Sequence, residues 1–131
     1  GLALHYATDI DTVFRQVHQS LAPDGVFVFS IEHPFITAPL RNVGFTKTED
    51  GVDSWPVDSY FTEGERSVNW LVEGVVKQHR MMSTYHTALA DAGFEMTAMD
   101  EWGKTNDQSR KHPDWIEGVC PRFLLIGAKK R

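Results

Sequence analysis

The sequence predicts an α/β fold in which a sheet ends in an antiparallel pair of strands. Two observations lead to this prediction. A helical segment runs directly through a tight turn into an apolar strand at Val26–Ser30, which is half of a strand–helix–strand unit. The final strand-like run, 122–128, follows its predecessor after a polar loop, 103–121, with no helical pattern. Strands joined without a crossover helix are expected to pair antiparallel.

The first helix is predicted from a single apolar stripe. Its apolar residues recur at helical spacing at Ile10, Val13, Phe14, Val17 and Leu21. Thr8 or Asp9 is expected to cap its first turn, and the turn Ala22–Gly25 ends it. The strand Val26–Ser30 shows no strict polar alternation, which favours a strand covered on both faces.

The middle of the chain is predicted to be an irregular insertion followed by a hairpin. Residues 35–65 show no regular period of apolar positions. Two strand-like runs, Arg66–Leu71 and Val75–Arg80, flank Glu73-Gly74, which is typical of a β-hairpin.

A second helix and a half-buried strand are predicted after this hairpin. Ser83 can cap a helix whose apolar positions are Tyr85, Ala88, Leu89 and Ala92, and Gly93 stands where helices commonly end. Phe94, Met96 and Ala98 then alternate with polar residues, as expected for a strand with one buried face.

Composition narrows the class of partner. The chain has 131 residues, of which 41% are hydrophobic and 24% charged, with a formal net charge of −5. The negative net charge argues against nucleic acid as a partner, because phosphate groups are bound by clustered basic residues. The longest apolar run, Gly25–Ser30, is too short for a membrane span. Cys120 is the only cysteine, so a reducing compartment, the cytoplasm, is predicted. The start at Gly1, directly in an apolar run, indicates a chain cut from a longer protein.

Several segments resemble class I S-adenosylmethionine-dependent methyltransferases, in the order of that family. Some are also similar to its type 11 subgroup. The segments are Leu2–Tyr6, Leu21–Gly25, Phe29–Pro34, Trp55–Phe61, Val76–Arg80, Ala92–Phe94, Glu101–Gly103 and Arg122–Leu125. The resemblance covers nearly the whole chain and implies a full-length methyltransferase that acts on a small molecule.

The resemblance also implies the fold in more detail. It is a partial Rossmann-like methyltransferase sheet of strands five, seven and six, with an antiparallel last strand and a cap insertion. Residues 1–131 would be the C-terminal part of one methyltransferase domain, with residues 35–80 as the cap and its hairpin. Phe123–Ala128 should then lie between Val26–Ser30 and Phe94–Asp100.

One departure from the family concerns the cofactor. The family's glycine-rich loop and its acidic ribose-binding residue are absent, and no Gly-x-Gly pair occurs in the chain. These features bind the cofactor through close backbone approach and a carboxylate–hydroxyl bond. S-adenosylmethionine is therefore expected as cofactor of the complete domain and not of this chain alone.

The resemblance assigns the first site residues. Leu4, His5 and Tyr6 would border the methionine end of the cofactor, with His5 or Tyr6 close to the acceptor. The alternative is structural, with His5 capping the following helix and Tyr6 packed beneath it.

A second candidate position follows the apolar strand. Glu32 and His33 stand at its carboxyl end, where open α/β sheets bind ligands. His33 can act as a base or orient the acceptor, so the catalytic candidates are His5 and His33, with Glu32 a substrate-binding candidate. A structural His-Pro turn is the equal alternative.

The cap supplies the remaining candidates. Residues expected to bind the substrate through stacking or charge are Tyr60, Arg66, Trp70, His79 and Arg80. The alternative is that the aromatics form the cap's own core while the arginines are solvated. No metal is predicted, because the histidines and the cysteine share no ligand spacing: His33, His79, His86 and Cys120.

Three hypotheses for function remain open. The first is the acceptor-side half of a methyltransferase, and the second is a non-catalytic self-associating or regulatory module derived from one. The third, half of a nicotinamide dehydrogenase, is disfavoured by the antiparallel last pair. In the implied strand order, strand five becomes an edge, so a homodimer through that edge or by segment exchange is expected.

Overall fold

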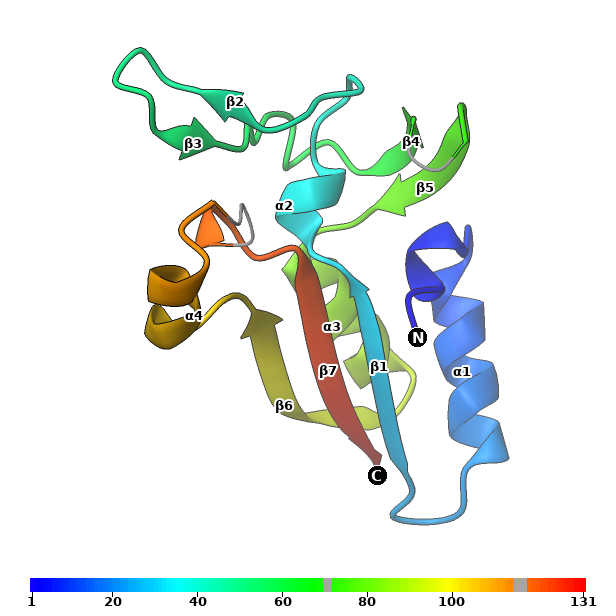
Figure 1. The fold of residues 1–131 in the computed structure, drawn as a ribbon. Coiled ribbons are helices and arrows are strands. Elements are labelled where there is room, and N and C mark those ends of the chain that lie inside the picture. Colours follow the sequence, from blue (N-terminus) through cyan, green and yellow to red (C-terminus); the bar gives the residue numbers. More distant parts are fainter. Residues whose placement is uncertain (70–71, 115–117) are drawn as a thin grey trace.

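A three-stranded sheet organises the molecule (Figure 1). The computed structural model describes residues 1–69, 72–114 and 118–131. Strands β1 (Val26–Glu32), β7 (Phe123–Lys130) and β6 (Phe94–Trp102) lie in the order β1-β7-β6, with β7 antiparallel to both neighbours. The predicted position of the last strand between the other two is confirmed, as is its antiparallel pairing.

One face of this sheet carries the core. Helices α1 (Ile10–Ser20) and α3 (Met82–Asp91) pack against it. The ring of Phe14 from α1 lies 5.9 Å from that of Phe27 and 5.6 Å from that of Phe29. Burying a side chain of this size stabilises the fold by about 1.5–3 kcal/mol. The buried cluster comprises Ile10, Phe14, Phe29, Ile31, Tyr85, Ala88, Leu89, Ala92, Phe94, Leu124, Ile126 and Ala128.

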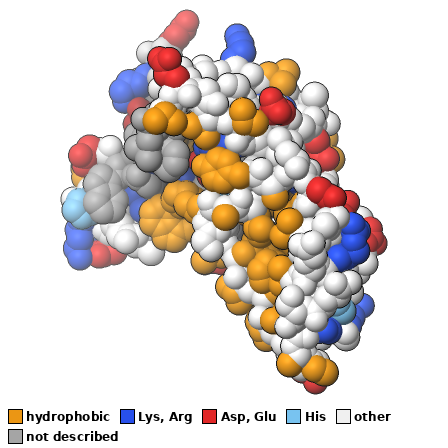
Figure 2. Space-filling view, turned by 90° about the vertical axis from the view of Figure 1, so that its right-hand side faces the viewer, with side chains coloured by type: hydrophobic (Ala, Val, Ile, Leu, Met, Phe, Trp, Pro, Cys, Tyr) orange, Lys and Arg blue, Asp and Glu red, His pale blue; other side chains and the backbone are white. Residues whose placement is uncertain are grey.

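The opposite face of the sheet is uncovered. Val26 and Val28 of β1 are exposed, the latter to 67%, together with Leu125 and Trp102. The expectation that β1 is covered on both faces is therefore wrong for this chain, because α1 and α3 lie on the same side. Figure 2 shows apolar side chains gathered down the middle of the molecule when it is viewed from its α1 side.

The two helices begin by different means. Asp9 caps α1 as predicted, since its Oδ1 accepts the N–H of Thr12 at 2.9 Å. Helix α3 starts at Met82, so Ser83 does not cap it. Instead, Glu63 Oε1 accepts the N–H of Met81 at 2.6 Å. A distant residue of the insertion thus replaces a local cap, which a local sequence pattern cannot predict.

Gly93 ends α3, as predicted. Its φ is +92°, a region that other residues rarely adopt, and a Cβ there would lie 2.8 Å from His18 Nε2. The chain can therefore turn directly from α3 into β6 beneath α1.

The insertion lies beyond the carboxyl end of β1 (Figure 1). Its elements are the short helix α2 (Pro34–Thr37) and the strands β2 (Thr46–Lys47), β3 (Asp53–Ser54), β4 (Gly64–Val68) and β5 (Val75–His79). The predicted hairpin is present as the antiparallel β4–β5 pair, with Gly64 opposite His79. Its first strand begins two residues earlier than predicted, and Leu71 lies outside the described residues.

The loop between β6 and β7 contains a helix that the sequence analysis missed. Helix α4 (Asn106–Lys111) begins at Thr105, whose hydroxyl accepts the Gln108 N–H, while the Gln108 side chain accepts the Thr105 N–H. This reciprocal pair is a capping box, which stabilises a helix without an apolar stripe. None of the helices in the described part of the chain is long and apolar enough to cross a membrane.

Candidate active site

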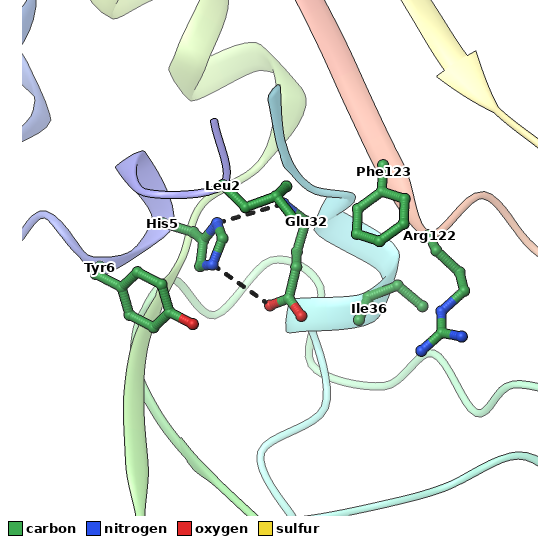
Figure 3. Close-up of a pocket in the computed structure, with 7 residues that line it drawn as sticks. All are labelled: Leu2, His5, Tyr6, Glu32, Ile36, Arg122 and Phe123. Atoms are coloured by element: carbon green, nitrogen blue, oxygen red, sulfur yellow. Dashed lines mark hydrogen bonds and ion pairs between the residues drawn. The ribbon is translucent and has the colours of Figure 1, made fainter. Parts of the chain in front are cut away.

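A cavity of about 130 Å³ lies where β1 ends (Figure 3). The 3₁₀ helix η1 (Leu4–Tyr6) supplies His5 and Tyr6 to its wall, and β1 supplies its last residue, Glu32. The full lining is Leu2, His5, Tyr6, Glu32, Ile36, Arg122 and Phe123. The carboxyl end of a strand is where α/β sheets bind their ligands.

An ion pair holds Glu32, the one carboxylate among the described residues that line this cavity. Lys77 Nζ of β5 donates to both carboxylate oxygens of Glu32, at 2.8 and 2.7 Å. The side chains of Lys77 and Glu32 are only 6% and 14% exposed. Lys77 therefore fixes the orientation of the carboxylate, and other lone pairs of its oxygens remain for groups in the cavity.

Glu32 also contacts His5 through its backbone and its side chain. Its backbone N–H donates to His5 Nδ1 at 3.3 Å, and its Oε2 lies 3.9 Å from His5 Nε2. Burial lowers the pKa of the His5 imidazole, the Glu32 carboxylate opposes this effect, and Lys77 adds to it. Because Nδ1 accepts a bond, the neutral ring carries its proton on Nε2, directed toward the carboxylate.

A second cavity adjoins the first. It measures about 100 Å³ and lies on the side of α2 and the β4–β5 hairpin. Its lining is Glu32, Ile36, Thr37, Arg66, Val68, Asn69, Lys77 and Arg122. Glu32, Ile36 and Arg122 line both cavities. The Glu32 carboxylate therefore lies between the first cavity, with Leu2 and Phe123 in its wall, and the second, with Arg66 and Lys77 in its wall.

His33 occupies a different environment. It is fully buried, its Nδ1 accepts the Phe35 N–H at 3.1 Å, and its Nε2 lies 2.9 Å from Glu101 Oε1. Burial lowers the pKa of this imidazole, and the bond to Glu101 opposes the shift. His33 caps α2 and is absent from the lining of both cavities beside Glu32.

Two of the cap candidates hold the insertion together. His79 Nε2 donates to the Tyr60 carbonyl at 2.8 Å, and its Nδ1 lies 2.9 Å from the Thr37 hydroxyl. The Tyr60 hydroxyl accepts the N–H of Met82 at 3.3 Å, at the start of α3. Burial lowers the pKa of the His79 imidazole. Neither Tyr60 nor His79 lines the two cavities beside Glu32.

The two arginine candidates are both buried, rather than solvated as the alternative had it. Arg66 lines the second cavity, and its Nε donates to the Ala38 carbonyl at 3.0 Å. Arg80 donates to the carbonyls of Ala7 and Thr8, directly after η1. It thereby anchors the segment that presents His5 and Tyr6. The remaining candidate, Trp70, lies outside the described residues.

Comparison with known proteins identifies the fold. No protein-family model matches the chain. It is 43% identical to an S-adenosylmethionine-dependent methyltransferase of known structure from Mesorhizobium loti, with a TM-score of 0.88. A structure from Listeria monocytogenes, described as the same kind of methyltransferase, is 36% identical with a TM-score of 0.85. The chain carries part of an S-adenosylmethionine-dependent methyltransferase fold.

The likeness concerns only part of each relative. The chain is covered to 98% and 99% in the two structural matches but spans 59% of each solved chain. An uncharacterized protein of Haemophilus influenzae is 28% identical over 132 aligned positions, and this chain spans 52% of it. Together with the observed strand order, this coverage is consistent with the C-terminal half of a methyltransferase domain.

The methyltransferase fold allows a test of which residues fit the cofactor. Of the three candidates, His5 and Tyr6 line the first cavity, whereas Leu4 packs against the core. The cavity volume of about 130 Å³ is below the roughly 300 Å³ from which pockets for whole ligands start. The cavity among the described residues is therefore too small to enclose a whole cofactor.

Lys77 and Arg122 were missed by the sequence analysis as site residues. A usable signal existed for Lys77, because Val75, Lys77 and His79 alternate along one face of β5. A lysine on a face that is otherwise buried needs an acidic partner. Arg122 gave no such signal, since it stands in a loop. Among the described residues, no group of three or more His, Cys, Asp or Glu is placed to hold a metal.

Proposed function

We propose that this chain forms the acceptor side of an S-adenosylmethionine-dependent methyltransferase that acts on a small molecule. The observation that carries the proposal is the Glu32 carboxylate, fixed by Lys77 between two cavities at the end of β1. Two solved methyltransferases share the fold. The insertion 35–80 serves as the cap over the acceptor, and the protein works in the cytoplasm.

The residues of this chain would orient the acceptor and receive its proton. The cofactor, when bound, supplies a methyl group on a sulfonium sulfur, which an acceptor lone pair can attack. Glu32 is the base that accepts the acceptor's proton, because its remaining lone pairs can reach both cavities. Lys77 keeps the carboxylate oriented, and the Nε2 of neutral His5 lies 3.9 Å from it. Tyr6 and Phe123 limit access of water to this carboxylate.

Cofactor binding is proposed to require the rest of a methyltransferase domain. The chain contains no Gly-x-Gly pair, and its first cavity is too small to enclose a whole cofactor. A chimera can test this requirement, in which the part of the Mesorhizobium loti methyltransferase that this chain does not cover is joined to it.

Thermal-shift titration with S-adenosylmethionine is the direct experiment. A ligand that binds only the native state raises the melting temperature, by mass action. We expect no shift for this chain alone and a concentration-dependent shift for the chimera, followed by methyl transfer to a small acceptor. A folded chimera that neither binds the cofactor nor transfers a methyl group would refute the proposal.

A second candidate function is self-association without catalysis. It is favoured by β1, which is an edge strand with exposed Val26 and Val28 on its uncovered face. We expect the isolated chain to form a homodimer through this edge. Light scattering of the isolated chain and of a Val28→Lys variant measures this directly. A dimer that persists in the chimera without any cofactor binding would favour this second function over the first.

A further inference from the structure

The second cavity has a lining rich in basic side chains. Arg66, Lys77 and Arg122 line it, and Glu32 is the single carboxylate in its lining. Lys77 is paired with Glu32, whereas the side-chain hydrogen bonds of Arg66 run to backbone carbonyls. The chain as a whole carries a formal net charge of −5, so this group of basic residues contrasts with the overall charge. A concentration of like charge in a partly enclosed space favours a ligand of opposite charge.

Burial makes this charge energetically significant. The side chain of Arg66 is only 3% exposed, and Lys77 is also buried. The bonds of Arg66 run to the carbonyl oxygens of Ala38, Glu65 and Thr62. Carbonyl groups satisfy N–H donors but do not neutralise a charge. A buried charge is destabilising unless a charged partner compensates it.

The described residues provide little compensation for Arg66. No carboxylate oxygen within the described ranges lies within 4 Å of its guanidinium, and burial lowers its pKa. Asp58 acts on Arg66 from a distance, but its own carboxylate pairs with Arg41 at 3.6 Å and accepts the Leu40 N–H. The one carboxylate in the lining, Glu32, is bonded by Lys77 through both oxygens.

We propose that the second cavity binds an anionic oxygen group, a carboxylate or a phosphate, of the methyl acceptor. The proposal rests on the proposed function for the identity of the ligand as an acceptor. The cavity of about 100 Å³ has room for such a group, since a water-sized group needs only about 10–15 Å³ by this measure. Arg66 and Arg122 can bind an anion with planar, forked donors.

The adjoining cavity suggests how the rest of the acceptor lies. Leu2, Ile36 and Phe123 give the first cavity apolar walls. In Figure 3, the Arg122 guanidinium lies beyond Ile36, on the side away from His5 and Tyr6. A molecule with an anionic end beside Arg122 and an apolar body between Ile36 and Phe123 would pass the Glu32 carboxylate. The atom to be methylated is then placed next to the proposed base.

Binding of two isosteric probes tests this inference without the cofactor. Phenylacetate and phenylacetamide differ mainly in charge, and phenyl phosphate tests the second kind of oxygen group. Backbone NMR of the full chain would follow Thr37, Val68 and Arg122 during each titration. Charge-assisted bonds are stronger than neutral ones by an amount that corresponds to about tenfold in affinity. We therefore expect at least one anion to bind about tenfold more tightly than the amide.

Variants of Arg122 sharpen the test, because its side chain lies at the edge of the cavity. Arg122→Met should remove most of the preference for the anion, and Arg122→Lys should restore part of it. Arg110→Met is the matched control, since it removes the same charge from exposed α4, outside both cavities, and should leave the preference unchanged. Should Arg122→Met fail to fold, loss of the preference with rising salt gives the same information.

The possible outcomes separate this inference from the proposed function. Equal binding of the acids and the amide, an undiminished preference in Arg122→Met, or no shift at the named residues with any probe would each overturn the inference. If the chimera binds S-adenosylmethionine but shows no preference for an anion, only this inference fails. If the preference is present and the chimera does not bind the cofactor, the anion site stands and the methyltransferase proposal falls.

Discussion

Two buried histidines near the carboxyl end of β1, His5 in η1 and His33 directly after the strand, both face a glutamate but lie in very different surroundings. In both His5 and His33, Nδ1 accepts a backbone N–H. The Nε2 of His33 lies within hydrogen-bond distance of Glu101 at 2.9 Å, whereas the Nε2 of His5 lies 3.9 Å from Glu32, beyond that distance. The pKa of both imidazoles is lowered, mainly by burial. Yet the partner of His5, Glu32, is only 14% exposed and bonded to Lys77, whereas Glu101, the partner of His33, is 51% exposed.

This difference shows what makes a buried histidine a candidate for chemistry. His33 has its two nitrogens engaged, caps α2 and does not line either cavity beside Glu32. His5 lines a cavity together with a carboxylate that a third residue, Lys77, holds in place. Space for a ligand and a supported neighbour distinguish the two sites. Burial and a glutamate partner do not, because both histidines have them.

The strongest test of the comparison is Glu32→Gln in the chimera. Loss of a general base typically lowers a rate by 10²–10⁴-fold, so we expect methyl transfer to fall by about that factor. Transfer from radiolabelled S-adenosylmethionine to a panel of small hydroxy and amino acids measures it. Glu101→Gln is the matched control and should retain the rate. Similar losses in both variants would remove the distinction between the two sites.

Lys77→Met should have the largest effect on stability. Removing one partner of a buried ion pair leaves the other charge uncompensated and typically destabilises a protein by about 3–5 kcal/mol. Urea denaturation of the isolated chain would measure the change. The double variant Lys77→Met, Glu32→Gln should recover part of the loss, because no unpaired carboxylate remains. If Lys77→Met is as stable as the unaltered chain, the pair does not fix Glu32.

Stability should also fall in mild acid. Burial lowers the pKa of His5, His33 and His79 below the ordinary value of 6.5. Below pH 6.5 the unfolded chain therefore binds protons that the folded chain does not, and the free energy of unfolding decreases as the pH falls. Urea midpoints across this range measure the effect. His33→Asn should flatten the dependence, while replacement of the exposed His86 serves as control; a midpoint constant below pH 6.5 would contradict the assignment.

The smallest effect is expected for Glu101→Gln on stability. Exposed ion pairs contribute about 0–1 kcal/mol, and Glu101 is half exposed. The amide oxygen of glutamine can still accept the His33 Nε2–H. We expect the urea midpoint to change little, in contrast to Lys77→Met. A loss as large as that of Lys77→Met would mean that the His33–Glu101 pair is as strongly coupled to the fold as the Glu32 site.

Much of the fold followed from local patterns. The apolar stripe predicted α1, and Asp9 predicted its start. Gly93 predicted the end of α3. The capping box of α4 was present in the sequence as Thr105 and Gln108, but the polar character of the loop obscured it. The start of α3 was not predictable locally, because its N–H groups are bonded by Tyr60 and Glu63 of the insertion.

For the candidate site, the sequence pointed to the right end of the sheet and could not rank the residues there. It named His5 because its segment resembles that of the methyltransferases, and Glu32 and His33 because they follow the apolar strand Val26–Ser30. It gave no indication that Lys77, which is 45 positions from Glu32, bonds that carboxylate. It also missed Arg122, which the fold brings beside Ile36.

The sequence by itself determined the order of the core elements α1, β1, α3, β6 and β7 and the antiparallel last strand, since apolar periodicity, caps and turn residues act between near neighbours. Only the tertiary structure decided which charges meet. Hydrogen bonds and ion pairs such as those among His5, Glu32 and Lys77 extend over about 3–4 Å. Whether such a pair forms therefore depends on how the insertion folds back over the end of β1. The spacing of residues along the sequence does not reveal this distance in space.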